Sequence, residues 1–196
     1  MTTPLHEDAL DQLFNSARTH FAWQARAVSD EQLMHIYELM KMAPTSANCS
    51  PTRIVFVKSP TAKEKLRPCL IKENVEKTMQ APVTAIIAYD RIFHEQLPTL
   101  FPHTDAKSWF VGNPELIEST AFRNSSLQGA YFILAARALG LDCGPMSGFD
   151  AAEIDTAFFP DSQFHANFLV NVGYGDASKL YPRAPRLSFP QACRIE

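Results

Sequence analysis

The sequence lacks the cysteine patterns of a zinc site or a disulfide scaffold. Its four cysteines are widely scattered, and no two form a Cys-x-x-Cys pair: Cys49, Cys69, Cys143 and Cys193. Both kinds of site need cysteines at close or regular spacing. We therefore expect a protein of a reducing compartment, the cytoplasm. His94, His103 and Asp105 match no common metal-ligand spacing either, and we predict no metal site.

Long apolar runs and an excess of one charge sign are also missing. No apolar run approaches the ~20 residues that a membrane helix requires. The formal net charge is −3, and the cationic residues are not gathered in one run. Residues 1–11 are polar and contain acids, unlike a signal peptide. We expect neither a membrane nor a nucleic acid as a partner.

Two common catalytic motifs are absent as well. No Gly-x-Ser-x-Gly segment supports a serine hydrolase. The segment 173–175 reads Gly-Tyr-Gly and begins like a dinucleotide-binding fingerprint. However, Ser178 replaces its third glycine, and Pro182 and Pro185 prevent the helix that should follow. We predict a turn that ends a strand there, and no side-chain constellation that catalyses a reaction by itself.

Helical patterns stand out at two places. Ser29 and Gln32 form a capping-box pattern at the start of an amphipathic segment that Pro44 closes. A longer pattern covers residues 115–139, and Gly140 behind it is a typical C-terminal cap. Small residues on this second helix favour close approach of another helix; they are Ser125, Ser126, Gly129 and Ala130.

Three apolar stretches predict strands. Residues 83–89 show no polar alternation, as expected of a central strand buried on both faces, and residues 54–57 and 168–172 are further candidates. The charged stretch 61–79 between the first two favours helix. Together the patterns predict one helix-rich α+β domain over residues 1–196, with a small mixed, mostly antiparallel sheet.

Two proline-containing segments are unlike ordinary linkers. Residues 90–114 contain three prolines and four large aromatic side chains, which we interpret as a lid or binding segment. Residues 181–190 also contain three prolines, which exclude a regular helix. We expect an extended C-terminal arm over about 177–196, whose Leu187 and Phe189 need burial.

Two segments rich in small residues and proline are the most informative. Residues 44–51 read Pro-Thr-Ser-Ala-Asn-Cys-Ser-Pro, and residues 144–150 read Gly-Pro-Met-Ser-Gly-Phe-Asp. We interpret both as irregular backbone that presents N–H and C=O groups to a flat, polar ligand. Because they add little side-chain chemistry, we expect a bound cofactor to carry the reaction.

Two groups of donors accompany these segments. Arg18 ends a predicted first helix, and Arg183 and Arg186 lie in the arm. Alone, each fits a surface charge; together they would suit a phosphate. Asn74 and Lys77 lie one helical turn apart before the buried strand. They form either a solvated helix face or a donor pair for a ligand at the strand end.

The combination of segments resembles the nitroreductase family of flavoproteins over nearly the whole chain. Within that family it is most similar to the branch of malonic semialdehyde reductases of pyrimidine catabolism. The segment 44–51 is typical of the family, whereas 144–150 and the arm are typical of the branch. The full set of matching segments is 17–20, 42–51, 100–103, 122–126, 144–150, 173–176 and 182–189.

The resemblance implies a nitroreductase-like fold in an intertwined homodimer, with FMN at the subunit interface and each arm on the partner subunit. It implies that Asn74 binds the pyrimidine edge of the flavin ring and that Lys77 supports negative charge near N1 and C2=O. The phosphate ligands would be Arg18, His20, Arg183 and Arg186. Backbone groups of Pro145, Met146, Ser147 and Gly148 would face N5 and O4. The other subunit would supply Pro44, Thr45, Ser46 and Asn48.

The chain departs from the family pattern at three places. Ala22 stands where family members often carry a second basic residue. Residues 50–52 read Ser-Pro-Thr instead of Gln-Pro-Trp, and Ser147 replaces a common acidic residue. These departures argue against a generic nitroaromatic pocket.

The implied activity is reduction by NADH or NADPH in a ping-pong sequence, with the hydride carried on flavin N5. The implied substrate is malonic semialdehyde, which would be reduced to 3-hydroxypropionate. One alternative keeps the cofactor but makes the enzyme a broad NAD(P)H nitroreductase or quinone reductase. Two others are a flavin-binding protein without turnover and a domain without flavin.

Overall fold

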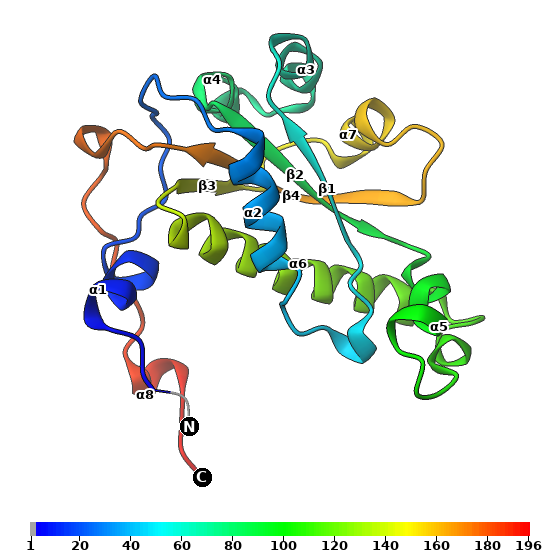
Figure 1. The fold of residues 1–196 in the computed structure, drawn as a ribbon. Coiled ribbons are helices and arrows are strands. Elements are labelled where there is room, and N and C mark those ends of the chain that lie inside the picture. Colours follow the sequence, from blue (N-terminus) through cyan, green and yellow to red (C-terminus); the bar gives the residue numbers. More distant parts are fainter. Residues whose placement is uncertain (1–2) are drawn as a thin grey trace.

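The computed structural model describes residues 3–196. Its centre is a four-stranded sheet in the order β1-β2-β4-β3, with β1 at Thr52–Val57, β2 at Val83–Asp90, β3 at Asp142–Met146 and β4 at Phe164–Gly173. Each neighbouring pair of strands is antiparallel. The one parallel pairing within these residues is an isolated bridge between Thr19 and Cys143. The expected α+β fold with a mostly antiparallel sheet is confirmed (Figure 1).

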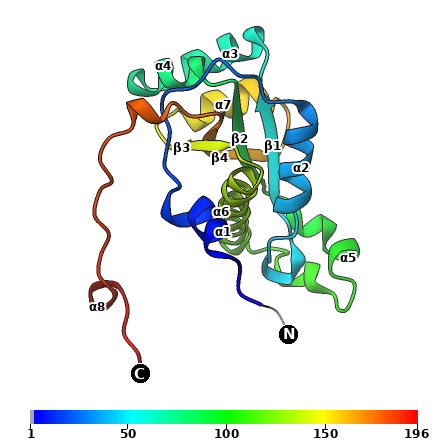
Figure 2. The ribbon, with the colours of Figure 1, turned by 60° about the vertical axis from the view of Figure 1, so that its left-hand side comes forward.

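Helices cover both faces of the sheet (Figures 1 and 2). One face carries α2 (Asp30–Met40) and α6 (Pro114–Ala138); the other carries α3 (Pro60–Leu66), α4 (Lys72–Gln80) and α7 (Ala151–Phe158). The remaining helices are short: α1 (Glu7–Leu10), a π turn (Asp11–Asn15), α5 (Leu97–Leu100) and α8 (Phe189–Ala192). Short 3₁₀ turns occupy Ser46–Asn48, Arg67–Cys69, Phe93–Gln96, Ala106–Trp109 and Ala177–Lys179. Among the helices of residues 3–196, none combines the length and apolar character needed to cross a membrane.

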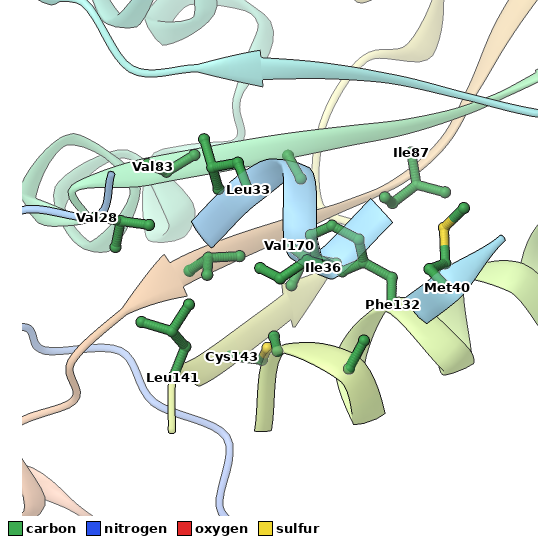
Figure 3. Packing of buried hydrophobic residues seen from close by; sticks show 14 residues of the cluster. Val28, Leu33, Ile36, Met40, Val83, Ile87, Phe132, Leu141, Cys143 and Val170 are labelled. Carbon is green, nitrogen blue, oxygen red and sulfur yellow. The ribbon is translucent and has the colours of Figure 1, made fainter. Parts of the chain in front are cut away.

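The two faces of the sheet hold separate hydrophobic cores, and β2 contributes to both. On the face covered by α2 and α6, Leu33, Ile36 and Met40 of α2 pack with Phe132 of α6 (Figure 3). Every residue of β2 is buried. The prediction that residues 83–89 form a central strand buried on both faces is therefore confirmed.

Two predicted helix ends are also confirmed, whereas the first helical segment ends at Asn15 and not at Arg18. The side-chain oxygen of Ser29 accepts from the backbone N–H of Gln32 at 3.2 Å, and the Gln32 side chain accepts from the Ser29 N–H at 3.0 Å. Behind the C-terminal end of α6, Gly140 has φ +75°, and its N–H donates to the carbonyl of Arg137 at 2.9 Å. A residue without Cβ adopts this left-handed conformation at little cost, which explains glycine there.

Two segments differ from their predicted form. The stretch 61–79 is not one helix, because Pro68 lies in the 3₁₀ turn between α3 and α4, where its missing N–H interrupts the helical hydrogen bonds. The segment 144–150 is irregular only in its second half. Gly144, Pro145 and Met146 belong to β3, and this strand tolerates a proline because it lies at the edge of the sheet.

The small residues of α6 divide between two faces. Ser125 donates to a backbone carbonyl of β2 at 3.3 Å, and a Cβ at Gly129 would lie 2.3 Å from the ring of Phe168. At these two positions the expected close approach of another helix is wrong, because the chain's own sheet fills the space. Ser126 and Ala130 instead line a groove on the outer face of α6.

The segment 90–114 packs as a small third core. Phe93, Leu97 and Phe110 are buried in it together. Asn48 donates from its side-chain amide to a carbonyl of this segment, that of Leu100, at 2.8 Å. The segment therefore supports the loop 44–51, and its action as a lid stays a prediction.

The last residues leave the domain as an arm, drawn in red in Figure 2. Residues 180–188 form no helix or strand, and the short helix α8 follows. Leu187 and Phe189 are 71% and 60% exposed. The extended arm is confirmed apart from α8, and its contact with a partner subunit stays a prediction.

A buried lysine lies between α3, α4 and β2. Lys63 is only 5% exposed, and its ammonium donates to the carbonyl of Thr78 at 2.8 Å and to the hydroxyl of Thr84 at 2.7 Å. Both partners are neutral. Burial lowers the pKa of Lys63 from 10.5 to about 8, because the charged form loses its hydration.

This lowered pKa predicts a pH dependence of stability. Between pH 8 and 10.5 the folded state holds fewer protons at Lys63 than the unfolded state does, so the free energy of unfolding rises with pH. We expect the free energy of unfolding of the wild type to rise by about 3 kcal/mol relative to that of Lys63→Met across this range. Urea unfolding at several pH values measures it. A pH-independent difference would contradict the assignment.

Candidate functional site

A pocket of about 750 Å³ opens at the β3 edge of the sheet. Three parts of the chain surround it: the segment before α2, one face of α4, and the start of the arm. Its lining residues are Thr19, His20, Phe21, Ala22, Glu73, Glu76, Lys77, Gln80, Gly144, Pro145, Lys179 and Tyr181. The pocket thus joins segments that are far apart in the sequence.

Helix α4 contributes one wall. Glu73, Glu76, Lys77 and Gln80 recur at intervals of three and four residues and therefore share one helical face. Lys77 is half-buried. Its backbone carbonyl accepts from the indole N–H of Trp23 at 3.1 Å, which ties this turn of α4 to the segment before α2.

Asn74 lies on the same helix, buried behind the wall. Its side-chain amide donates to the carbonyl of Gly148 at 2.8 Å, so α4 and the segment after β3 are joined. A Cβ at Gly148 would lie 2.6 Å from the amide nitrogen of Asn74 and 2.4 Å from Ile71, so the close approach needs glycine. Among residues 3–196, no donor reaches the Asn74 side-chain oxygen.

The edge strand β3 forms the floor of the pocket. Pro145 lines it directly. The next two residues face elsewhere: Met146 packs into the core beneath α4, with the Thr78 hydroxyl 3.5 Å from its sulfur, and Ser147 is exposed. Of the predicted run 145–148, Pro145 lines the pocket and Gly148 holds Asn74.

His20 is placed at the pocket with its ring turned inward. The residue is 6% exposed, and Nε2 lies 3.3 Å from a carboxylate oxygen of Asp142. The other ring nitrogen, Nδ1, is buried and has no hydrogen-bond partner within residues 3–196. It faces Gly175, where a Cβ would lie only 1.9 Å away. The glycine after β4 thus makes room for a histidine.

Arg18 and Arg183 join the N-terminal segment to the arm. Arg18 donates to the carbonyl of Tyr181 at 2.5 Å, and Arg183 donates to the carbonyls of Asn15 and Ala17 at 2.6 and 3.0 Å. The ring of Tyr181 stacks on Phe21 with centroids 5.0 Å apart. The two predicted phosphate ligands therefore lie beside the pocket along the contact between the N-terminal segment and the arm, which we call the Arg18–Arg183 seam. Their separation in the sequence gave no indication of this proximity.

The remaining predicted residues lie elsewhere. Within the described part of the chain, Arg186 donates only to the nearby carbonyls of Ala184 and Pro185 in the arm. The loop 44–51 is held at α6, where Asn124 accepts from the Ser46 N–H at 2.9 Å. None of Pro44, Thr45, Ser46 and Asn48 lines the pocket of their own chain.

Sequence reasoning missed several pocket residues. These are Phe21, Glu73, Glu76, Gln80, Lys179 and Tyr181. The three on α4 had a usable signal, because they share the helical face of Lys77. Lys179 and Tyr181 had none, since only the return of the chain after β4 brings them to the segment before α2.

The buried cysteines are poor nucleophiles. Burial raises the pKa of Cys49 to about 11 and that of Cys143 to about 12. Both stay protonated at neutral pH, and the thiolate is the reactive form. None of the four cysteines lines the pocket, so the pocket itself offers no thiolate for covalent catalysis.

The fit between His20 and Gly175 gives a stability prediction. We expect Gly175→Ala to lower the free energy of unfolding by about 1–3 kcal/mol, because the methyl group would overlap the imidazole ring. Urea unfolding measures this. Adding His20→Ala opens the space, so the double variant should be less destabilised than the sum of the single variants predicts. Strict additivity would contradict the contact.

Comparison with known proteins identifies close relatives. The model of the family described as "Nitroreductase family" matches residues 15–174. A protein of Polynucleobacter asymbioticus is 67% identical over 195 residues and covers all of both chains. One of Burkholderia lata is 62% identical over 194 residues, covering 99% of this chain and 100% of the relative. Both carry the provisional name NADH dehydrogenase/NAD(P)H nitroreductase.

A solved structure has the same fold. It is a protein of Exiguobacterium sibiricum, provisionally described as a nitroreductase and determined in complex with FMN. The TM-score is 0.86 over 100% of each chain, at 20% sequence identity. At this identity the likeness concerns the fold.

Proposed function

The chain belongs to the nitroreductase family, a family of FMN-dependent oxidoreductases, and from this premise we propose that it binds FMN in the pocket beside β3 and uses NADH or NADPH to reduce a small aldehyde acid. The observation that carries the proposal is the meeting of Asn74, Lys77 and Pro145 at one edge of the sheet. These residues come from two elements, α4 and β3, and all were expected to contact the flavin ring.

The pocket and its donors fit FMN. A volume of about 750 Å³ lies within the usual range of small-molecule and cofactor sites. The planar guanidinium groups of Arg18 and Arg183 retain donors beyond those used for backbone carbonyls, and such donors suit a phosphate. Asn74 is held by Gly148, and its side-chain oxygen receives no donor from residues 3–196, so it can accept from a polar ring edge.

FMN held in this pocket would supply a hydride carrier between the nicotinamide and the substrate. The chain's own residues then need to orient the ring and stabilise charge. Lys77 supplies a half-buried cation, which favours negative charge on an adjacent ring. Asn74 fixes the ring's polar edge, and the Arg18–Arg183 seam anchors the phosphate. The buried Nδ1 of His20 faces Gly175 at close range, which leaves little space for a ligand atom beside it. We therefore assign His20 to the pocket wall, where it supports the site without binding the phosphate.

A second copy of the chain completes the site in this proposal. The loop 44–51 does not reach the pocket of its own chain, although its residues match the family's flavin-binding segment. The outer face of α6 carries an apolar groove with Phe122, Leu127 and Ala130, and the arm carries exposed Leu187 and Phe189. Family members are typically dimeric. An intertwined homodimer would cover both apolar surfaces and bring each 44–51 loop to the partner's pocket.

We infer malonic semialdehyde as the substrate from the branch-typical segments 144–150 and the arm. Ser147 and the Ser-Pro-Thr sequence at 50–52 depart from the acidic residue and the Gln-Pro-Trp sequence common in the family, which argues against a generic nitroaromatic pocket. The names of the relatives favour a second candidate, an NAD(P)H nitroreductase or quinone reductase of broad specificity.

The visible absorption spectrum of the purified protein tests the proposal. We expect a flavin spectrum that NADH or NADPH bleaches under anaerobic conditions and that malonic semialdehyde then restores. Restoration by a nitroaromatic compound or a quinone, but not by the aldehyde acid, would favour the second candidate. Bound FMN that neither nucleotide bleaches would indicate a flavin-binding protein without turnover, and no binding of added FMN would contradict the proposal.

The dimer gives a separate prediction. Ala130→Glu places a charge in the groove of α6, so we expect a monomer in sedimentation velocity and at least about tenfold weaker FMN binding. The matched control is Ala152→Glu, an exposed position on α7 across the sheet, which should leave the mass unchanged. A dimeric Ala130→Glu protein would place the interface elsewhere.

A further inference from the structure

The last turn of α4 has unusual hydrogen-bond needs. In a continuing helix, the carbonyl of Thr78 would accept from the N–H of residue 82. That residue is Pro82, which has no N–H, and Ala81 already has an extended backbone with ψ 137°. The helix therefore ends here with carbonyls that need donors from elsewhere, because unpaired buried backbone groups are costly.

Lys63 supplies one of those donors. Its ammonium lies 2.8 Å from the Thr78 carbonyl and 2.7 Å from the Thr84 hydroxyl in β2. A cation at the C-terminal end of a helix also interacts favourably with the helix dipole. Burial of a lysine ammonium whose hydrogen-bond partners are neutral costs free energy of folding, so a lysine at this buried position needs a reason beyond solubility.

A second set of contacts completes the arrangement. Asn171 of β4 accepts from the Thr84 hydroxyl at 2.7 Å, and its amide lies 3.4 Å from the Lys77 carbonyl and from the Thr78 hydroxyl. Two elements thus hold the turn that carries Lys77 directly, α3 through Lys63 and β4 through Asn171, and Thr84 of β2 joins these two side chains. Lys77 itself faces the pocket, one residue before the carbonyl that Lys63 binds.

We propose that Lys63 is a positioning residue for the flavin site: it replaces the missing Pro82 N–H at the end of α4 and so fixes the side chain of Lys77 in the pocket. The inference rests on the proposed function, because it concerns FMN bound beside Lys77. Lys63 does not touch the cofactor; it acts through the backbone of Thr78.

A double-mutant cycle on FMN affinity tests this inference. The dissociation constant of FMN is measured by fluorescence titration for the wild type, Lys63→Met, Lys77→Ala and the double variant. We expect Lys63→Met to weaken binding about tenfold and to have an effect below about twofold when Lys77 is already alanine. The control is Lys65→Met, an exposed lysine of the same helix, which should bind FMN as the wild type does.

The outcomes separate the two proposals. One contrary result is that the wild type binds FMN and Lys63→Met binds it equally well. Another is that Lys63→Met weakens FMN binding by the same factor in the wild type and in Lys77→Ala. Either result shows that the positioning inference is wrong and leaves the proposed function standing. If the wild type binds no FMN, both are wrong. Thermal unfolding shows whether each variant folds. If Lys63→Met does not fold, the variant Thr84→Val takes its place, because valine removes one hydrogen-bond partner of Lys63 and keeps nearly the same shape. We again expect weaker FMN binding that depends on the presence of Lys77. Unchanged FMN binding would overturn the inference.

Discussion

The central strand β2 is buried along its whole length and helices cover both of its faces, so the pocket opens at a margin of the sheet and not over its centre. One margin is β3, a short edge strand that contains a proline. There the segment before α2 and the start of the arm approach the sheet without closing over it. The resulting pocket is lined by the edge strand and by charged and polar side chains of α4, and such a mixed lining is typical of small-molecule and cofactor sites.

The end of α4 connects this pocket to the core. Its last carbonyls are satisfied by Trp23 from the pocket side and by Lys63 and Asn171 from the interior. Such a network is stable only when every member is paired, because buried polar groups left unpaired cost more than the bonds contribute. A change in the core beneath α4 is therefore expected to reach the pocket through the helix end.

The candidate flavin ligands fall into two groups within one chain. Arg18, Asn74, Lys77 and Arg183 gather at the pocket, whereas the loop 44–51 is held at α6 and at the segment 90–114. Left-handed backbone at Ala47, Asn48 and Ser50 keeps this loop in one strained shape. A preformed loop and an unfilled apolar groove on the same helix are both consistent with a partner subunit that uses them together.

Local signals in the sequence were sufficient for much of the fold. The capping box at Ser29, the glycine cap at Gly140 and the uniform apolar run 83–89 each report on neighbouring residues alone, and each is found as predicted. The division of 61–79 at Pro68 and the placement of 144–146 in a strand were missed. A proline marks an interruption without indicating which element comes after it, and an edge strand tolerates residues that a central strand excludes.

The sequence by itself determined most of the elements, the absence of a catalytic motif, and the resemblance that named Arg18, Asn74 and Lys77. Only the tertiary structure decided which of those residues meet. Arg18 contacts the arm that carries Arg183 because the chain returns along the N-terminal segment after β4, and Lys179 and Tyr181 join the pocket for the same reason. Convergence of this kind depends on packing between distant segments, and periodicity and composition carry no record of it. Lys63 is the clearest case: by composition it is one more surface lysine, and only burial under α4 gives it a role.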